Sequence, residues 1–466
     1  MPESHAIRTP RLPTIFQIIL LCLAIIGLIY LCVQVLVLPI QLALLASWFL
    51  VIALGTFLGH QYQFMQSAIN NGIAKGMDAI LILIAVGALI GAWMAGGVVP
   101  NIIHLGLSFI SPSIFLLAAF LLCALSSIAT GTSFGTAGTA GVAMMGIGAS
   151  FGMSMPLVAG AVISGAYLGD KLSPLSDTTV MTASLCEVSL IAHIKSMLYV
   201  SVPAFLLAAI LFFIAGFLYG DVGDTGRVQE VMKALEHQYT IAWYMFIPAL
   251  IVIAMLVAKF PSMPVILFGA TLGVMWAILF EGLDVISAIL SIYNGNSIST
   301  DMAFLNTLLN RGGIASMLEV ILLIILALGL GGLMDATGVL GRIASGLQKW
   351  AKTLSKLSIS TLFAGLLGNI FGGAAYVSLI TASTITAKNY DKLGVDRRVL
   401  SRNTEAGGTI TTPMVPWSDG GVFMAAALGV STIAYLPFLW FHFLVILISV
   451  LYAFMDWFCF SNKAKQ

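Results

Sequence analysis

Charge is scarce in this sequence of 466 residues, of which only 8% are Asp, Glu, Lys or Arg. Soluble domains carry about a quarter charged residues, so a soluble globular fold is excluded. Lys and Arg number 20 and Asp and Glu 19, so the chain has neither the basic surface that nucleic acid requires nor an acidic tail. With 60% hydrophobic residues and a mean hydropathy of +1.05, the chain is predicted to cross a membrane many times.

Motifs of enzymes and cofactor sites are scarce as well. No G-x-x-x-x-G-K-[ST] loop for nucleotide phosphates occurs. Gly131–Gly135 fits the G-x-S-x-G pattern of hydrolases, but a helix is expected before it, where that motif requires a strand. Tyr167–Asp170 resembles a motif of intramembrane aspartyl proteases, for which Asp177 and Asp419 would have to form a dyad. We therefore predict no enzyme and no cofactor. The cysteines lack metal-ligand spacing: Cys22, Cys32, Cys123, Cys186 and Cys459.

Apolar runs long enough for transmembrane helices recur along the chain. The first follows Arg8 and Arg11 and is too long for a cleaved signal peptide. Residues 112–190 and 358–428 are also apolar, but Gly, Ser, Thr and Pro interrupt each of them twice. Because unpaired backbone groups cannot face lipid, these breaks are expected to line a cavity. Spans are predicted at residues 14–36, 39–59, 77–97, 197–219, 238–258, 263–281, 316–336 and 432–455.

The two interrupted stretches resemble each other. Ser173–Asp177 and Val415–Asp419 share a Pro-x-Ser-Asp sequence at an offset of 419 − 177 = 242. Upstream, Asp78 and Glu319 align at 319 − 78 = 241. The chain is therefore predicted to be a duplication, with repeats at residues 1–225 and 226–466. The same register pairs Gly165 with Gly407, Gly131 with Gly373, Thr136 with Ser378, and Thr139 with Thr381.

Lys and Arg accumulate on the cytoplasmic side of a membrane, and their distribution indicates how the repeats are oriented. Segments 342–356, 388–402 and 463–465 are basic, whereas 98–111 and 150–156 lack Lys and Arg. Both termini are therefore predicted to be cytoplasmic. Each half is predicted to cross the membrane five times. Because five is an odd number, the two halves are predicted to have opposite orientations.

This orientation fits if residues 112–151 and 358–387 are re-entrant hairpins. Residues 156–190 and 398–428 are then crossing helices, each broken at its Pro-x-Ser-Asp. We predict an all-α integral membrane protein with two inverted-topology repeats. Each has about five transmembrane helices plus a re-entrant hairpin, with broken helices at the midplane. This is the architecture of secondary transporters.

The broken crossing helices are predicted to bind a cation. Pro174 and Pro416 remove backbone donors and leave carbonyls free beside Asp177 and Asp419. Such oxygen ligands suit Na⁺, and a carboxylate at the midplane costs about 2.5–3.5 kcal/mol, so it seldom lacks a function. The alternative is that each Asp only caps the restarted helix. The predicted cation or proton ligands are Asp177, Asp419, Ser173, Ser176, Thr178, Ser418 and Glu405.

The hairpin turns are predicted to bind an organic anion. Their glycines let the backbone leave helical geometry, and short helices that begin there point N–H groups and a positive dipole end at the midplane. This arrangement suits a carboxylate, and close helix packing by small residues is the alternative. The predicted anion ligands are Thr130, Thr132, Ser133, Thr136, Thr139, Asn369, Ser378 and Thr381.

Other ionisable residues have simpler interpretations. Asp170 and Lys171, a few residues before the first break, are candidates for an ion pair with each other. Asp78 and Glu319 lie where a surface segment meets a span, which favours compensation of the helix dipole.

Residues Gly165–Thr179 resemble the signature of the NhaC-type Na⁺/H⁺ antiporters, in the ion-transporter superfamily. Ala129–Ser133, Leu400–Glu405 and Met414–Asp419 are similar especially to the branch that exchanges sodium and lactate for protons and malate. The resemblance implies exchange of Na⁺, carried with an organic acid such as lactate, for H⁺, carried with malate. It also implies location in the lipid of the cytoplasmic (inner) membrane, elevator-like movement, and a homodimer as a frequent assembly. A simple Na⁺/H⁺ antiporter without organic substrate is the alternative.

Overall fold

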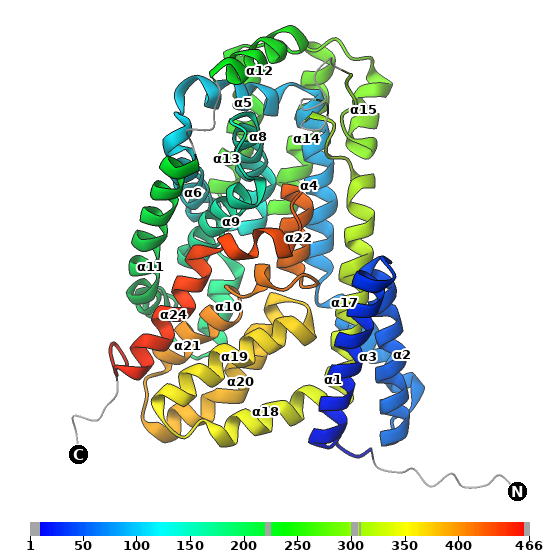
Figure 1. Ribbon diagram of the computed structural model, residues 1–466, viewed down its shortest axis with the longest axis vertical. Helices are drawn as coiled ribbons and strands as arrows, with labels where there is room; N and C mark the ends of the chain where they lie inside the picture. The colour runs from blue at the N-terminus through cyan, green and yellow to red at the C-terminus, as the bar shows by residue number, and fades with distance from the viewer. Residues whose placement is uncertain (1–9, 220–224, 300–305, 307–308, 461–466) are drawn as a thin grey trace, which may run out of the picture.

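The computed structural model consists of helices, many of which run along one long axis (Figure 1). No strand occurs among the residues described, which confirms the all-α prediction. The chain ends, with Arg8, Lys463 and Lys465, lie outside the described residues, so the cytoplasmic position of the termini stays a prediction. The structure describes residues 10–219, 225–299, 306 and 309–460.

Helices α1 to α11 occupy the chain up to residue 219. Their beginnings carry ordinary helix signals. Thr14 and Gln17 form a capping box at α1, and Pro112 stands in the first turn of α6. The helices are α1 (Ile15–Tyr30), α2 (Ile40–Leu58), α3 (Tyr62–Ala74), α4 (Met77–Ala95), α5 (Val98–Phe109), α6 (Pro112–Thr130), α7 (Ser133–Thr136), α8 (Val142–Ser150), α9 (Met155–Leu172), α10 (Asp177–Leu185) and α11 (Leu190–Tyr219).

Helices α12 to α24 occupy the chain from residue 225 to residue 454. Side-chain oxygens again cap several of them, as Asp284 does at α15, Thr353 at α19 and Asp396 at α21. The helices are α12 (Thr225–Gln238), α13 (Ile247–Val257), α14 (Ser262–Leu279), α15 (Val285–Asn294), α17 (Leu318–Ala336), α18 (Val339–Trp350), α19 (Leu354–Gly372), α20 (Ala375–Leu393), α21 (Arg397–Gly407), α22 (Asp419–Leu428), α23 (Thr432–Tyr435) and α24 (Trp440–Phe454).

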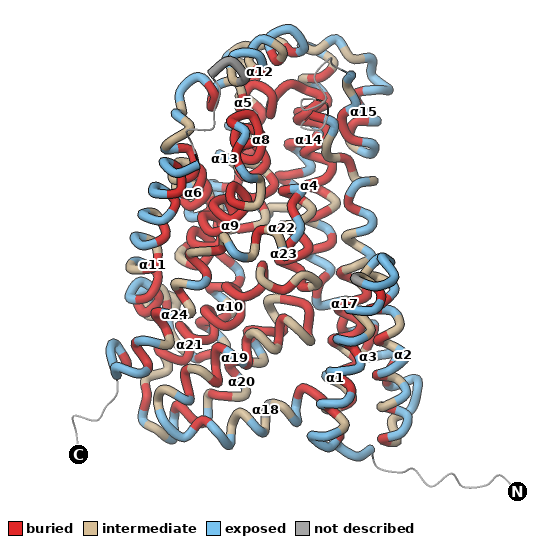
Figure 2. Tube along the Cα trace, viewed as in Figure 1, coloured by how far each residue is buried: buried red, intermediate tan, exposed pale blue. Residues whose placement is uncertain are grey.

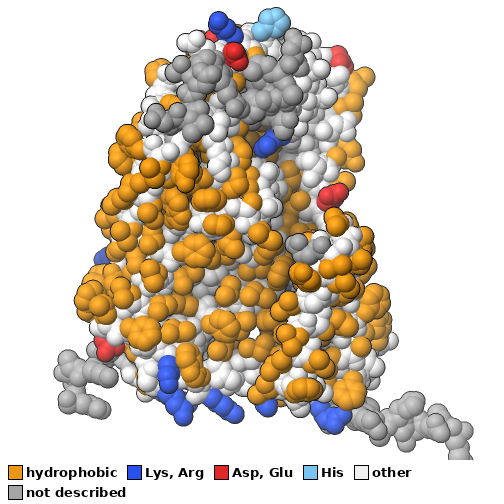
Figure 3. Space-filling model, viewed as in Figure 1, with side chains coloured by type: hydrophobic (Ala, Val, Ile, Leu, Met, Phe, Trp, Pro, Cys, Tyr) orange, Lys and Arg blue, Asp and Glu red, His pale blue; other side chains and the backbone are white. Residues whose placement is uncertain are grey.

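Eight helices of the described chain are long and apolar enough to cross a membrane, or up to ten if each of two sharply bent helix pairs is one span. Six of the eight, α1, α2, α4, α11, α14 and α17, coincide with predicted spans. The other two, α6 and α19, are the first arms of the predicted hairpins. Hydrophobic side chains cover much of the face in Figure 3, and Lys and Arg gather at its lower end. The chain is a multi-pass membrane protein.

The predicted span 238–258 begins too early, because the helical segment within it runs from Trp243 to Val257. The chain bends by 91° between α12 and α13. Asn101 of α5 fixes this turn, because its amide nitrogen donates to the Thr240 carbonyl at 2.9 Å and its amide oxygen accepts from the Ala242 N–H at 3.1 Å. Hydropathy does not register this polar contact. α13 is left with only 11 residues.

The predicted span 432–455 is also interrupted. After α23 the chain makes a short turn at Leu436–Phe438 before α24 begins. Pro437 contributes to the interruption because it lacks a backbone donor. The backbone leaves helical geometry at Leu439, which has φ −77° and ψ 56°. The Tyr435 hydroxyl holds the turn by donating to the Pro413 carbonyl at 2.8 Å. α24 has 15 residues and is shorter than a full span.

Two helical hairpins occupy the stretches where hairpins were expected. α6 turns at Gly131 into α7 and α8, and α19 turns at Gly373 into α20. Both glycines have left-handed φ angles, 73° and 68°, which other residues rarely adopt. The second hairpin extends to Leu393 and is therefore longer than the predicted 358–387.

Two helices that follow the hairpins are broken. α9 ends at Leu172 and the chain restarts as α10, and α21 ends at Gly407 and the chain restarts as α22. Pro174 and Pro416 lie in the two breaks, as the sequence predicts. Each restarted helix begins with an aspartate, which is Asp177 or Asp419.

The helix boundaries recur at the offsets found in the sequence. The numbers of the first residues of α17 and α4 differ by 318 − 77 = 241, and those of α18 and α5 differ by 339 − 98 = 241. For α19 and α6 the difference is 354 − 112 = 242, and for α22 and α10 it is 419 − 177 = 242. The turns and breaks therefore fall at equivalent places in the two parts of the chain.

Glycines allow the broken helices to pack closely on the hairpins. α9 is buried along most of its length (Figure 2). A Cβ atom on Gly165 of α9 would collide with the Phe120 carbonyl oxygen of α6. A Cβ atom on Gly407 of α21 would lie 2.7 Å from the Cα of Leu362 in α19. These contacts are equivalent, since 362 − 120 = 242 and 407 − 165 = 242.

Substituting Gly165→Ala should therefore destabilise the protein by about 1–3 kcal/mol, because α9 must move away from α6. Thermal unfolding of the purified protein in detergent measures this change. Gly346→Ala in α18 is the matched control, because nothing lies within 4 Å of its Cβ position. The control should be neutral or slightly stabilising. Equal unfolding temperatures for both variants and the native protein would contradict the close packing.

Candidate functional site

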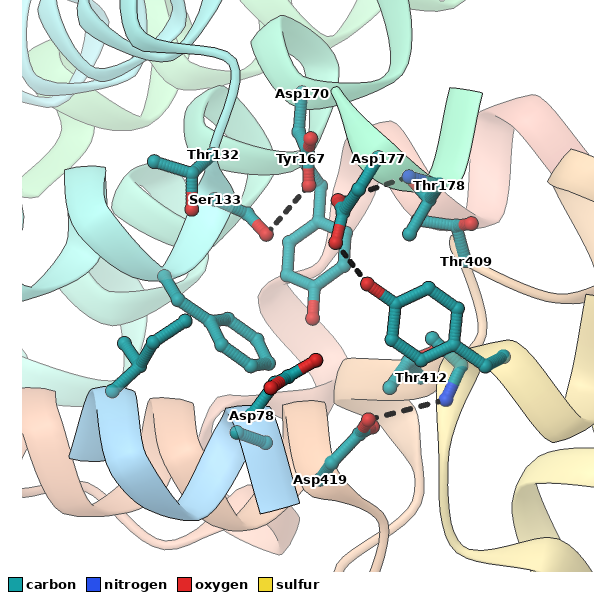
Figure 4. A pocket seen from close by; sticks show the side chains of 15 residues that line it. Asp78, Thr132, Ser133, Tyr167, Asp170, Asp177, Thr178, Thr409, Thr412 and Asp419 are labelled. Carbon is teal, nitrogen blue, oxygen red and sulfur yellow. Dashed lines mark hydrogen bonds between the residues drawn. The ribbon is translucent and has the colours of Figure 1, made fainter. Parts of the chain in front are cut away.

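A polar cavity lies where the hairpin turns meet the two broken helices (Figure 4). Its volume of about 80 Å³ is enough for a few water molecules or a partly hydrated ion. Its walls come from α4, α7, α9, α10, α20 and α22, from the turn before α7, and from the segment between α21 and α22. The polar lining residues are Asp78, Thr132, Ser133, Tyr167, Asp170, Asp177, Thr178, Tyr376, Thr409, Thr412 and Asp419.

Four carboxylates reach this cavity, and no Lys or Arg is among the described residues that line it. They belong to Asp78, Asp170, Asp177 and Asp419. The predicted pair Asp177 and Asp419 is therefore brought together, although the residues are far apart in the sequence. Carboxylates in such an enclosure favour a cation or a proton.

Asp419 is held between two helix beginnings. Its carboxylate accepts from the N–H of Gly420 in α22 at 2.7 Å and from the N–H of Ala375 in α20 at 3.2 Å. Its own N–H donates to the Gly373 carbonyl at 2.8 Å. The side chain is only 5% exposed. The positive ends of two helix dipoles therefore stabilise this charge and join α22 to the hairpin turn.

Asp177 connects the first broken helix to the second hairpin. One carboxylate oxygen accepts from the Thr178 N–H at 2.9 Å, and the other accepts from the hydroxyl of Tyr376 in α20. Sequence reasoning did not select Tyr376 as a ligand. The available signal was its alignment with Phe134 at 376 − 134 = 242, where a hydroxyl distinguishes the two hairpins.

Asp170 faces the cavity and does not pair with Lys171. The Ser133 hydroxyl donates to one oxygen of Asp170 at 2.7 Å, while the other oxygen is buried without a hydrogen-bond partner. The hydroxyl of Tyr167 is also buried without a partner. Figure 4 shows both side chains among those around the cavity. These oxygens are available to an ion in the cavity.

Hydroxyls of the first hairpin turn divide into two groups. Thr132 and Ser133 line the cavity, and Thr132 also caps α7 by accepting from the Gly135 N–H at 3.2 Å. Thr130 and Thr136 lie 3.4 Å apart, outside the lining. Thr139 donates to the Gly135 carbonyl at 2.7 Å. Only two of these five predicted anion ligands therefore reach the cavity.

The predicted anion ligands of the second hairpin do not reach it. Asn369 donates to the Gly408 carbonyl at 2.7 Å and to the Thr411 hydroxyl at 2.8 Å. Ser378 donates to the Gly365 carbonyl. Thr381 lines a different cavity. Asn369 and Ser378 thus brace the hairpin against its neighbours.

The serines of the breaks also bind backbone groups. Ser173 donates to the Ile128 carbonyl at 2.9 Å. Ser176 and Ser418 cap the restarted helices α10 and α22. Thr178 lines the cavity, and its hydroxyl lies 3.0 Å from that of Ser176. Among the predicted hydroxyl ligands of a cation, the structure therefore places only Thr178 at the cavity.

Glu405 lies outside the cavity lining, in the last turn of α21, where it is buried. Thr182 of α10 donates to one of its oxygens at 2.5 Å, and the other oxygen is buried without a hydrogen-bond partner. The ammonium of Lys171 is likewise buried without a hydrogen-bond partner. Glu405 and Lys171 are therefore buried polar residues that do not line the cavity.

Asp78 is the most informative residue that sequence reasoning placed elsewhere. It stands in the first turn of α4, as expected for compensation of the helix dipole, and its side chain also lines the cavity. In the described part of the chain, no three Asp, Glu, His or Cys side chains converge closely enough to hold a metal ion by themselves. A bound Na⁺ would therefore take hydroxyl, carbonyl or water oxygens as well.

Comparisons with known proteins agree with this chemistry. A sequence model described as the Na⁺/H⁺ antiporter family matches residues 5–195 and 165–457. The chain is 51% identical over 459 residues to the Malate-2H(+)/Na(+)-lactate antiporter of Bacillus subtilis (strain 168), with 98% of each chain covered. It is 36% identical to the Na(+)/H(+) antiporter NhaC of Alkalihalophilus pseudofirmus, and the match covers 86% of this chain and 87% of that antiporter. It is 32% identical to the arginine/ornithine antiporter ArcD of Halobacterium salinarum, and the match covers 88% of this chain and 85% of that antiporter.

Tyr376→Phe should increase the affinity for Na⁺, because the Tyr376 hydroxyl occupies an Asp177 oxygen that can otherwise bind the ion. The half-saturating Na⁺ concentration should fall by about 10-fold or more, as expected for one hydrogen bond to a charged group. Na⁺-dependent thermal stabilisation of the purified protein measures it. Tyr199→Phe on α11, away from the cavity, is the control. A rise in the half-saturating concentration would show that the hydroxyl is itself a ligand.

Proposed function

Because the chain belongs to the Na⁺/H⁺ antiporter family, we propose that it exchanges Na⁺, together with a small organic acid such as lactate, for H⁺, together with malate. The four carboxylates of the cavity carry this proposal, since a carboxylate can bind either Na⁺ or H⁺ and the two ions therefore compete. The site moves ions and catalyses no covalent change. Asp177 and Asp419 are the proposed primary ligands of Na⁺.

Charge neutralisation explains the coupling. An empty cavity with ionised aspartates is costly to move through an apolar barrier. Na⁺ or protons bound there remove most of this cost. Loaded forms therefore change orientation and empty forms do not, which makes the movement of one ion depend on the movement of the other.

Two observations support an organic acid as a further substrate. The relative that is 51% identical is an antiporter of malate and lactate, and another relative is an antiporter of arginine and ornithine. Thr132 and Ser133 add hydroxyl groups to the cavity at the start of α7. The rival function is Na⁺/H⁺ exchange without an organic acid, which the likeness to NhaC supports.

We also propose that residues 1–225 and 226–466 are inverted repeats, with hairpins near 112–151 and 358–387. Equal offsets between helix boundaries support this, as does the equivalent glycine packing. The basic end would face the cytoplasm. In this arrangement the hairpins and broken helices would move against the other spans, in the cytoplasmic membrane and as a homodimer.

Asp419→Asn and Asp177→Asn test the cation function. Each should weaken Na⁺-dependent transport about 10-fold or more, because an interaction with a charged group contributes about 1.5–3 kcal/mol. Purified protein in lipid vesicles with an imposed Na⁺ gradient allows measurement of proton and carboxylate fluxes. Asp391→Asn is the control, since that exposed carboxylate pairs with Arg397 outside the cavity. Native Na⁺ dependence in both cavity variants would refute the proposal.

The same vesicles separate the two functions. If an organic acid is carried, a Na⁺ gradient drives uptake of labelled lactate or malate, and the proton flux depends on the acid supplied. Proton flux that is the same with and without every acid tested would establish the simple Na⁺/H⁺ antiporter instead.

A further inference from the structure

Two side chains of opposite charge are buried outside the cavity, on α9 and α21, and both of these helices contact α10. Lys171 of α9 and Glu405 of α21 are 0% exposed. One Glu405 oxygen accepts from Thr182 of α10, whereas the other, Oε1, and the Lys171 ammonium have no hydrogen-bond partner among the described residues. A charge buried without a partner is costly, so an opposite charge or a proton must offset it. The function proposed above uses neither residue.

The two side chains interact through their charges without a direct hydrogen bond. Lys171 is close enough to attract the Glu405 carboxylate. On the cavity side, Asp170 and Asp177 are close enough to repel it. The charge on Glu405 therefore responds both to a fixed cation and to the carboxylates of the cavity.

The elements around the pair contribute further titratable groups. These are Arg402 of α21, Cys186 of α10, His193 of α11 and His442 of α24. On the α20 side, the Tyr390 hydroxyl accepts from Asn403 at 2.9 Å, and on the α19 side Ser358 accepts from Asn403 at 3.1 Å. The carboxylates that act on Glu405, Asp170 and Asp177, belong to the cavity, where a bound ion neutralises them.

Two short connections lead from the pair to the cavity. Lys171 directly follows Asp170, which lines the cavity. Thr409 also lines the cavity and stands 409 − 405 = 4 residues after Glu405 (Figure 4). Its hydroxyl lies near the Glu405 carboxylate but makes no aligned hydrogen bond to a described residue. Because a hydroxyl both accepts and donates, Thr409 provides a path for a proton between Glu405 and the cavity.

The equivalent positions in the other part of the chain carry no charged or hydroxyl side chain. The three equivalences, all at an offset of 242 because 405 − 163 = 242, are Glu405 with Ile163, Lys171 with Pro413, and Thr182 with Met424. Broken helices at equivalent places are thus built there without a buried charge pair. The pair is therefore not a requirement of the fold.

The ion in the cavity determines whether Glu405 is more stable with or without a proton. When the cavity is empty, Asp170 and Asp177 repel a further negative charge, which favours a proton on Glu405. Na⁺ in the cavity cancels this repulsion and leaves the attraction of Lys171, which favours the ionised carboxylate. Coupling between two sites is reciprocal, so a proton on Glu405 weakens Na⁺ binding by the same factor.

We propose that Glu405 is a proton-binding site separate from the Na⁺ site, which releases its proton when Na⁺ enters the cavity and regains it when Na⁺ leaves. This inference rests on the proposed function and adds a carboxylate outside the cavity to the four within it. On Na⁺ entry the O–H bond at Oε1 breaks, and its electron pair stays on that oxygen. The proton passes by way of Thr409 and the cavity to water. Lys171 stabilises the carboxylate that remains.

Glu405→Gln tests the assignment through the protons released when Na⁺ is added to purified protein in a weakly buffered detergent solution with a pH indicator. The variant should release up to about one proton fewer per bound Na⁺, since one titrating site contributes at most one. Its half-saturating Na⁺ concentration should depend less on pH and should exceed the native value at high pH, where native Glu405 is ionised. Glu230→Gln, which removes an exposed carboxylate of α12, is the control and should release protons normally.

Two further variants keep the carboxylate and change its surroundings. Lys171→Gln removes the attraction that favours ionised Glu405, so the pH of maximal proton release should move upward by about one pH unit or more. Thr182→Val removes the hydroxyl that donates to Glu405 and should move it upward by less. Thr182→Ser keeps this donor and should restore the native profile, which a merely structural role of Thr182 in packing does not predict.

Native proton release with native pH dependence in Glu405→Gln would overturn the assignment and leave the cavity carboxylates as the proton sites. If that variant does not fold, an unchanged pH of maximal release in the Lys171 and Thr182→Val variants that fold would overturn it instead. Native protein that binds Na⁺ without releasing protons would overturn it together with the competition between Na⁺ and H⁺ in the proposed function. The Na⁺ ligands are judged separately by the Asp177 and Asp419 variants.

Discussion

The structure depends on keeping four carboxylates in an apolar interior without a basic side chain in the described lining around them. Ionised groups lose most of their hydration there, and this cost must be offset locally. At Asp419, the N-termini of two helices offset part of this desolvation cost. The Ser133 hydroxyl offsets part of it at Asp170, and the Tyr376 hydroxyl offsets part of it at Asp177. A bound ion or proton offsets the remainder. The cost of burying the carboxylates therefore favours a cation or proton in the cavity, whichever organic substrate is carried.

This arrangement is possible because helices restart at the cavity. A continuous helix has no unpaired N–H groups in its middle, but each restart exposes several of them. The breaks have to be stabilised in turn, and polar side chains do this. Ser176 and Ser418 cap the restarted helices, and the Trp417 indole donates to the Ile370 carbonyl at 2.7 Å. Serines that resemble ion ligands in the sequence are thus occupied by backbone groups.

The sequence predicted the features that follow from local pattern. Apolar length located most spans, and glycine, proline and the repeated Pro-x-Ser-Asp located the turns, the breaks, Asp177 and Asp419. It missed features that depend on distant contacts. Hydropathy did not reveal the turn fixed by Asn101. No local signal showed that Thr139 binds its own helix or that Tyr376 reaches Asp177.

The two parts of the chain have similar backbones but different polar residues at equivalent positions. Tyr376 stands where the first part has Phe134, and Glu405 stands where it has Ile163. A symmetric backbone suits a site that must be reached in turn from both sides of the membrane. Symmetric side chains would give both approaches the same electrostatics. Such differences are therefore where selection among cargoes can reside. Tyr376 lies in the lining of the cavity, and Glu405 lies outside it.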